Sequence, residues 1–153
     1  MPKYLFLCSG FITFASVLAA QTSPPPAIYK NGADLMALIK SKLPATPDQA
    51  DAPVDNQSAY RINVVRRGKP GVAMAHATGP AKGTEVHYII DGAATVVTGG
   101  TIVRGTSSTI EGGETHHLTK GDVLVIPAGT PHWYKEVEGS VTYLEVRFDV
   151  DKK

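Results

Sequence analysis

One histidine in the sequence lies where an apolar β-strand ends in a tight turn. Residues 121–132 read GDVLVIPAGTPH, a run of valine, leucine and isoleucine followed by a proline–glycine turn. Such a strand is stable only when it is buried, and the turn reverses the chain so that His132 opens the next strand. A histidine held this rigidly at the mouth of a β-barrel is well suited to bind a metal ion. His132 is therefore the first candidate ligand.

The elements that must position this histidine are short strands that follow a single helix. Apolar residues recur at helical spacing within residues 31–43, and Pro44 ends the run. Residues 44–58 read as a polar, proline-containing connection. From Ala59 onward, apolar residues recur at every second position. Each of these alternating segments is bounded by glycine, proline, aspartate or serine, a pattern that is typical of strands. The expected strands lie at residues 60–64, 72–76, 85–91, 93–98, 101–104, 114–119, 122–126, 132–137 and 141–149.

Many short strands after one helix predict an all-β fold, an antiparallel sandwich or barrel. At 153 residues the chain has the length of one domain. We therefore expect residues 21–58 to form a linker and an N-terminal helix, and residues 59–153 to form the single β domain.

The first twenty residues have the pattern of a secretory signal peptide. Lys3 supplies a positive start, residues 5–18 are mostly apolar, and small side chains follow at Ala19 and Ala20. The alternative is an uncleaved membrane anchor, but the apolar run is shorter than the ~20 residues of a spanning helix. The sequence thus predicts an exported protein, periplasmic or extracellular, with no membrane attachment in its mature form.

Composition excludes some partners and some ligand types. The 15 basic and 14 acidic residues nearly balance, so no electrostatic argument favours nucleic acid. The one cysteine, Cys8, falls in the predicted signal peptide. A mature chain without cysteine would have to bind a metal through nitrogen and oxygen atoms.

Two motifs in the chain resemble those of the cupin superfamily. The run GDVLVIPAGTPH has the glycines, proline and histidine of the second cupin motif at the family's spacing. Upstream, Glu85 is followed by six residues and then Gly92, within TEVHYIIDG, which is similar to the second half of the first motif. The resemblance covers most of residues 60–149. It implies a double-stranded β-helix, the jelly-roll barrel of cupins, with Glu85 and His132 as ligands of a metal near its mouth.

The first motif also departs from the family pattern. The His-x-His pair that normally precedes the glutamate by four or five residues is absent from residues 78–81. Local geometry offers substitutes, because Glu85 and His87 are two apart on a strand and leave the same face about 7 Å apart. His76 shares its strand face with apolar residues. The predicted ligand set is His76, Glu85, His87 and His132, with Glu85 also predicted as a catalytic group.

Three imidazoles and a carboxylate suit a divalent metal (Fe, Mn, Ni, Cu or Zn) and do not select among these ions. Such an ion acts as a Lewis acid on a carbonyl or carboxylate, or activates water or dioxygen. Glu85 or an unliganded histidine would then move protons. Because cupin folds carry oxygenase, isomerase and lyase chemistry, the resemblance predicts a metal-dependent enzyme for a small oxygen-containing molecule without choosing the reaction.

Other interpretations stay open. The barrel could bind a small molecule without turnover, or be a structural cupin with no metal, and each inward histidine could be a hydrogen-bonded core residue. His116 is a reserve ligand, since adjacent His117 must point to the opposite face. Alternating residues near the chain end, Tyr143, Glu145 and Arg147, could reach a pocket or form a cross-strand salt bridge. By analogy with cupins, barrel edges could also pair two copies into a homodimer.

Overall fold

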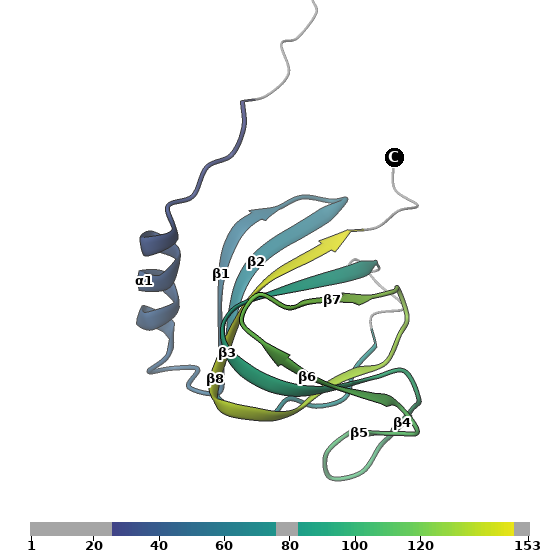
Figure 1. The fold of residues 1–153 in the computed structure, drawn as a ribbon. Coiled ribbons are helices and arrows are strands. Elements are labelled where there is room, and N and C mark those ends of the chain that lie inside the picture. The colour runs from purple at the N-terminus through teal and green to yellow at the C-terminus, as the bar shows by residue number, and fades with distance from the viewer. Residues whose placement is uncertain (1–25, 76–82, 149–153) are drawn as a thin grey trace, which may run out of the picture.

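The fold is that of a computed structural model that describes residues 26–75 and 83–148 (Figure 1). The predicted signal peptide lies outside these residues. No helix among them is long and apolar enough to cross a membrane. In chain order the elements are α1 (Gly32–Lys42), β1 (Gln49–Asn56), β2 (Tyr60–Arg67), β3 (Thr84–Thr98), β4 (Thr101–Val103), β5 (Thr109–Glu111), β6 (Glu114–Thr119), β7 (Val123–Ile126) and β8 (His132–Phe148).

Most of the strands belong to one antiparallel sheet that curls around a central core (Figure 1). The strand order is β1-β2-β8-β3-β6, with β7 also paired to β3. β4 and β5 form a separate two-stranded hairpin. The predicted all-β fold with one N-terminal helix is therefore confirmed.

Two long strands, β3 and β8, hold the sheet together by pairing along almost their whole length. The sequence predicts two shorter strands in place of each, because Gly92 and Gly139 read as turns. In the structure the strands bend instead of ending, and their register shifts between Gly92 and Ala93. Gly92 has a φ of +79°, and a Cβ there would overlap the carbonyl oxygen of Ser140. A glycine bend inside a continuous strand thus takes the place of a predicted turn.

The helix α1 covers the outer face of the sheet (Figure 1). Asn31 caps it, because its side chain accepts a hydrogen bond of 2.8 Å from the Ala33 backbone N–H. Ile39 is 1% exposed and packs with Ala50, Ala52 and Val64 of β1 and β2. The helix predicted at residues 31–43 is therefore confirmed, and its apolar stripe explains its place.

Strand β1 corrects the reading of residues 44–58 as a connection. Residues 49–56 pair antiparallel with β2, so the predicted boundary at residue 59 falls inside a hairpin. Small alanines allow this segment to lie close under α1, and Pro53 sits at an edge strand beside a register shift. Alanine and proline have low strand propensity, which is why sequence pattern alone missed the strand.

Two further segments differ from the prediction. In place of a strand at residues 72–76, the described part of this segment forms only a single bridge, between Met74 and His132. His76 itself lies outside the described residues. Conversely, the sequence does not predict β5, because a strand of three residues is too short to show an alternation of apolar and polar side chains.

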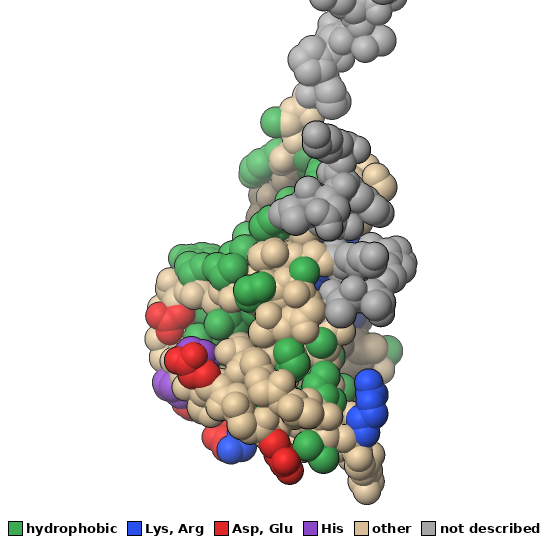
Figure 2. Space-filling view, turned by 90° about the vertical axis from the view of Figure 1, so that its right-hand side faces the viewer, with side chains coloured by type: hydrophobic (Ala, Val, Ile, Leu, Met, Phe, Trp, Pro, Cys, Tyr) green, Lys and Arg blue, Asp and Glu red, His purple; other side chains and the backbone are tan. Residues whose placement is uncertain are grey.

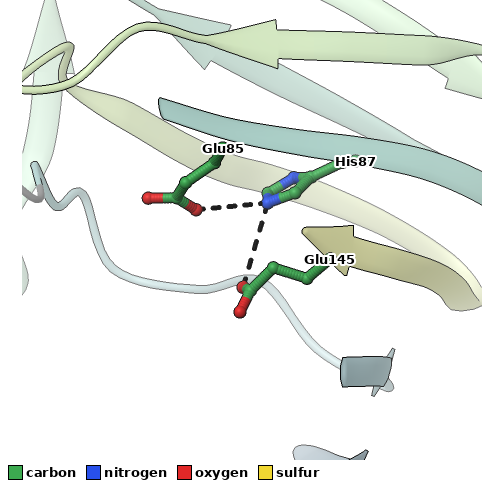
Figure 3. Close-up of side chains that lie close together, drawn as sticks. All are labelled: Glu85, His87 and Glu145. Atoms are coloured by element: carbon green, nitrogen blue, oxygen red, sulfur yellow. Dashed lines mark hydrogen bonds and ion pairs between the residues drawn. The ribbon is translucent and has the colours of Figure 1, made fainter. Parts of the chain in front are cut away.

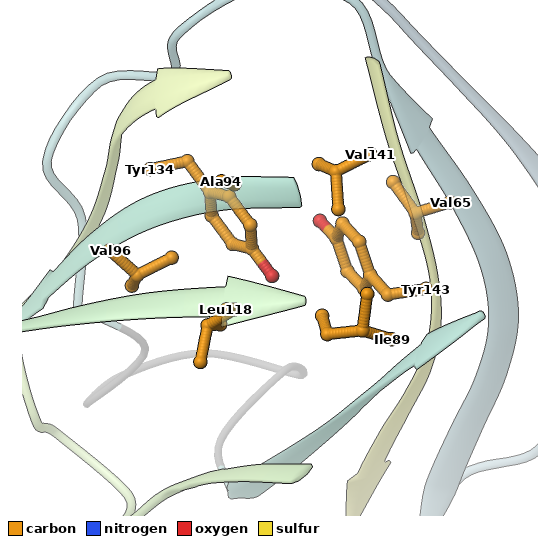
Figure 4. Packing of buried hydrophobic residues seen from close by; sticks show 8 residues of the cluster. All are labelled: Val65, Ile89, Ala94, Val96, Leu118, Tyr134, Val141 and Tyr143. Carbon is orange, nitrogen blue, oxygen red and sulfur yellow. The ribbon is translucent and has the colours of Figure 1, made fainter. Parts of the chain in front are cut away.

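The main core lies inside the barrel and is built around two stacked tyrosines (Figure 4). The rings of Tyr134 and Tyr143 lie 5.2 Å apart with an interplanar angle of 12°. Burial raises the pKa of Tyr143 from 10.0 to about 12. The cluster consists of Val65, Ile89, Ala94, Val96, Leu118, Tyr134, Val141 and Tyr143.

We expect Ile39→Ala to lower the free energy of unfolding by about 2–5 kcal/mol, since it removes buried apolar atoms and leaves a cavity under α1. Leu38→Ala is the matched control, because Leu38 is 39% exposed on the same helix. Its effect should stay below about 1 kcal/mol. Urea denaturation measures both, and equal losses would contradict the packing of α1 through Ile39.

The tyrosine core predicts a loss of stability at high pH. The folded protein holds the Tyr143 proton more tightly than the unfolded chain, so the stabilisation is complete below pH 10 and is lost as the pH rises towards about 12. The loss should reach about 3 kcal/mol. Tyr143→Phe should flatten this part of the pH profile in denaturation experiments, whereas Tyr88→Phe, at a residue 45% exposed, should not. Identical profiles for wild type and Tyr143→Phe would refute the prediction.

Candidate functional site

The candidate site is a group of polar side chains on the inner face of β2, β8 and β3. Alternate residues of a strand share a face, and residues directly opposite on paired strands share it too. Register therefore lines up two polar rows across the three strands. One row is Asn63, Glu145 and His87, and the next is Arg61, Arg147 and Glu85.

These rows place ionisable groups inside the barrel. Glu85 and His87 are each 2% exposed, and Arg147 is 7% exposed. A buried charged group is costly unless it is paired, so the members must compensate one another. Figure 3 shows Glu85, His87 and Glu145 with their side chains directed toward one another.

The Glu85 carboxylate is the centre of the group. Its Oε2 atom lies 3.2 Å from Nη2 of Arg147 and 3.3 Å from Nε2 of His87. His132 brings its Nε2 atom to 3.9 Å from the same oxygen. Glu145 completes the group, with an oxygen 3.9 Å from His87 Nε2 and 3.5 Å from Arg147 Nη2.

Both histidines are oriented by a bond to their other ring nitrogen. Nδ1 of His132 lies 3.2 Å from the Thr130 carbonyl oxygen, which can only accept, so this nitrogen carries the proton. Nδ1 of His87 lies 3.0 Å from the hydroxyl of Tyr134. The Nε2 atoms are thereby turned toward Glu85. Metal-binding histidines are commonly fixed in this way by a second partner.

The arrangement fits a divalent metal. Ligand atoms of Glu85, His87 and Glu145 all lie within 4.8 Å of one another. Atoms bound at about 2.1 Å to one metal lie roughly 3.0–3.4 Å apart, so these side chains need only small shifts to share an ion. With Nε2 of His132 the donor set is two imidazole nitrogens and two carboxylates, which suits the borderline metals from Mn to Zn.

The structure brings three of the four predicted ligands together: Glu85, His87 and His132. The fourth, His76, lies outside the described residues. Metal binding by this set stays a prediction. Glu145 is not among the ligands that the sequence predicts, although its alternation with Tyr143 and Arg147 indicates that it can reach a pocket. Only the pairing of β8 with β3 identifies His87 as its partner.

The two remaining histidines lie away from the cluster. His116 has its Nε2 atom 3.3 Å from the Thr98 hydroxyl. His117 is exposed, and its Nε2 atom lies 2.7 Å from a carboxylate oxygen of Glu138. Figure 2 shows histidine beside acidic side chains at the edge of this face of the molecule. His116 therefore does not serve as the reserve ligand of this group.

Aromatic residues after His132 separate into two roles. Tyr134 points into the barrel, where it contacts His87 and stacks on Tyr143. The indole N–H of Trp133 donates a hydrogen bond of 2.8 Å to the Gly71 carbonyl oxygen. Trp133 thus ties the preceding segment to β8, while Tyr134 supports the site.

Solved structures of several proteins have the same fold. Salicylate 1,2-dioxygenase from Pseudaminobacter salicylatoxidans is 18% identical with a TM-score of 0.60, over 78% of this chain and 34% of its own. The protein TT1209 from Thermus thermophilus is 18% identical with a TM-score of 0.56, over 80% and 97%. KdgF from Halomonas sp. is 19% identical with a TM-score of 0.51, over 69% and 83%. At these identities the likeness concerns the fold, and it confirms the predicted jelly-roll barrel.

The family of this chain is established by a match to a protein-family model, because likeness of fold alone does not establish it. No curated protein matches the chain. The model described as the Cupin domain matches residues 70–147, which include both motifs, the long strand β3 and all but the last residue of β8. With its barrel and its second motif intact, this chain belongs to the cupin family.

Proposed function

We propose that this protein is an exported, single-domain cupin that holds one divalent metal between Glu85, His87, His132 and Glu145. It acts as a metal-dependent enzyme on a small oxygen-containing molecule, with oxygenase, isomerase or lyase chemistry. One observation carries the proposal. Two imidazoles, each held through Nδ1, direct Nε2 toward the same buried carboxylate oxygen of Glu85.

Each residue has a distinct task in this proposal. A metal at this position would supply Lewis-acid polarisation of an oxygen atom of the bound molecule. Glu85 forms an ion pair with Arg147, and a carboxylate of this kind suits a ligand. Glu145 lines the adjoining cavity together with Arg147. The Glu145 oxygen that does not bind the metal would therefore be better placed than Glu85, the predicted catalytic group, to exchange a proton with a bound molecule.

Similar folds support an enzyme without identifying its reaction. Salicylate 1,2-dioxygenase has a dioxygenase activity in its name, and other structures of that protein contain gentisate. One fold hosts many reactions, so this analogy supports a small-molecule ligand in the barrel and leaves the reaction to experiment.

The alternative is a binding module without turnover. Its support is Arg147, which lies within 3.5 Å of both candidate carboxylate ligands and gives the site a positive charge of its own. Together with Arg61 and Arg67, which line the adjoining cavity, this charge could hold a small anion without any metal. Oxygen uptake and product analysis with small oxyacids, on metal-loaded protein, separate the two functions.

Export rests on the first twenty residues, with their basic start, short apolar run and small residues before a proline-rich segment. Detection of the mature protein outside the cytoplasm, with its N-terminus near residue 21, would support this part of the proposal.

A homodimer is the proposed assembly. The outer face of β3 and β7 carries three exposed apolar side chains, Tyr88, Val123 and Val125, of which Tyr88 and Val123 are direct cross-strand partners. Figure 2 shows hydrophobic side chains gathered on part of the molecular surface. Exposed apolar patches of this kind commonly mark interfaces, and a second copy would cover this one.

Elemental analysis of protein purified without a histidine tag tests the metal site. We expect about one equivalent of metal per chain, as the single donor set implies. His132→Ala and Glu85→Gln should each lose most of it, because each removes one donor from a four-residue set. His117→Ala, at an exposed histidine outside the cluster, is the matched control and should keep the metal.

Two results of this elemental analysis would contradict the proposal. Wild-type protein that is purified without metal, and that then takes up none of Fe, Mn, Ni, Cu or Zn, would refute the metal-binding function. A folded His132→Ala variant with full metal content would exclude His132 as a ligand.

A further inference from the structure

We propose that a cavity beside the candidate metal centre binds a small hydroxycarboxylate, with Arg61 and Arg67 supplying the positive charge that attracts the carboxylate and Asn63 accepting a hydrogen bond from the hydroxyl. The inference deepens the proposed function by naming its ligand class, and it rests on that function only for the neighbouring metal.

The cavity has a volume of about 190 Å³ and lies on the inner face of β2 and β8. Its polar lining includes Asp51, Arg61, Asn63, Arg67, Glu145 and Arg147. Pockets for drug-sized ligands measure roughly 300–1,000 Å³, so this one suits a molecule of only a few carbon atoms.

Charge in the lining favours an anion. When the ion-pair partners of the lining residues are included, four positive groups (Lys42, Arg61, Arg67 and Arg147) face three carboxylates (Asp51, Glu85 and Glu145), which leaves one positive charge in excess. Arg147 is already paired with Glu85 and Glu145. Arg61 and Arg67 form no ion pair with any other residue in the described ranges. A monoanion would balance this excess, whereas a dianion would leave a negative charge beside Asp51 and Glu145.

Arg67 is held in a fixed orientation. Its Nε donates a hydrogen bond of 2.9 Å to the Tyr143 hydroxyl, and its guanidinium carbon lies 5.0 Å from the centre of the Tyr134 ring. These contacts use the Nε edge and one face of the group. The terminal nitrogens can therefore pair with a planar carboxylate at little entropic cost.

Asn63 adds a requirement for a hydrogen-bond donor. Its side chain is 2% exposed, and among the described residues Oδ1 has no hydrogen-bond partner. A buried acceptor left unpaired costs about 1–3 kcal/mol, so a ligand that donates to it gains affinity. An ammonium group would be repelled by the neighbouring guanidinium groups. A hydroxyl group donates without adding charge.

Position links this ligand to the candidate metal centre. Asn63 lies directly opposite Glu145 in the β2–β8 register, and Glu145 lies 3.9 Å from Nε2 of His87. A hydroxyl group bound to Asn63 thus lies beside the proposed ligands, with Arg61 on one side of Asn63 along β2 and Arg67 on the other.

Lactate and propionate test the inference, because these two monoanions differ only in the hydroxyl. Calorimetric titration of the full-length protein should give lactate about tenfold tighter binding than propionate, the value of one added hydrogen bond. Asn63→Ala should remove this difference and leave propionate binding unchanged. Arg61→Gln and Arg67→Gln should weaken both acids alike, by about tenfold or more.

Arg66→Gln is the matched control, since Arg66 neighbours Arg67 on β2 but points to the opposite face. Its lactate affinity should equal that of wild type. Because Arg67 also contacts the tyrosine core, thermal melting checks that each variant is folded, and Arg61→Gln provides a test away from that core.

Titrations in EDTA and with added Mn²⁺ separate this inference from the proposed function. A protein that binds lactate but no metal would support the ligand site and refute only the metal-dependent function. A protein that binds one metal but neither acid would overturn the inference. Equal affinity for lactate and propionate, or tighter binding of inorganic phosphate than of lactate, would also overturn it.

Discussion

A carboxylate buried inside a β-barrel has to be surrounded by donors or positive charge, and in this protein that carboxylate belongs to Glu85. It is 2% exposed, and nitrogen atoms of Arg147, His87 and His132 lie within 3.9 Å of a single one of its oxygens. An ion left unpaired at such a position costs several kcal/mol. The same contacts that define the candidate site therefore also hold the end of β8 against the start of β3, so the candidate site and the packing of these strands share one set of charges.

The pleat of the sheet fixes which residues enter this set. On β2, β8 and β3 the register is unbroken from Arg61 to Arg67 and from Thr84 to Ile89, and the two polar rows lie within this regular part. Register shifts begin beyond Ile89, where the strands bend through Gly92. A slip of one residue would turn every inward group outward. Bends outside the polar rows thus let the sheet close into a barrel without disturbing the site.

Local pattern was sufficient to predict the helix, the second-motif strand that precedes the turn to His132, and the shared face of Glu85 and His87, although Val123 and Val125 of that strand are exposed and not buried as expected. It was insufficient wherever the answer depended on a distant partner. Because side chains alternate between the two faces of a strand, Glu145 and Arg147 lie on the same face of β8. Only the pairing of β8 with β3 brings them against His87 and Glu85. Similarly, β1 is a strand because α1 covers its alanines, a tertiary effect that overrides low strand propensity. His76 remains a candidate on sequence grounds alone.

Arg147 joins the two parts of the barrel, because its guanidinium contacts Glu85 and Glu145 and also lines the cavity that contains Arg61 and Arg67. A divalent cation shared by Glu85 and Glu145 would lie close to this guanidinium, and the two positive charges would repel. An anion in the cavity would offset that repulsion from the other side. Metal binding and anion binding would then be coupled through Arg147, and thermodynamic reciprocity would require each to change the affinity of the other by the same factor.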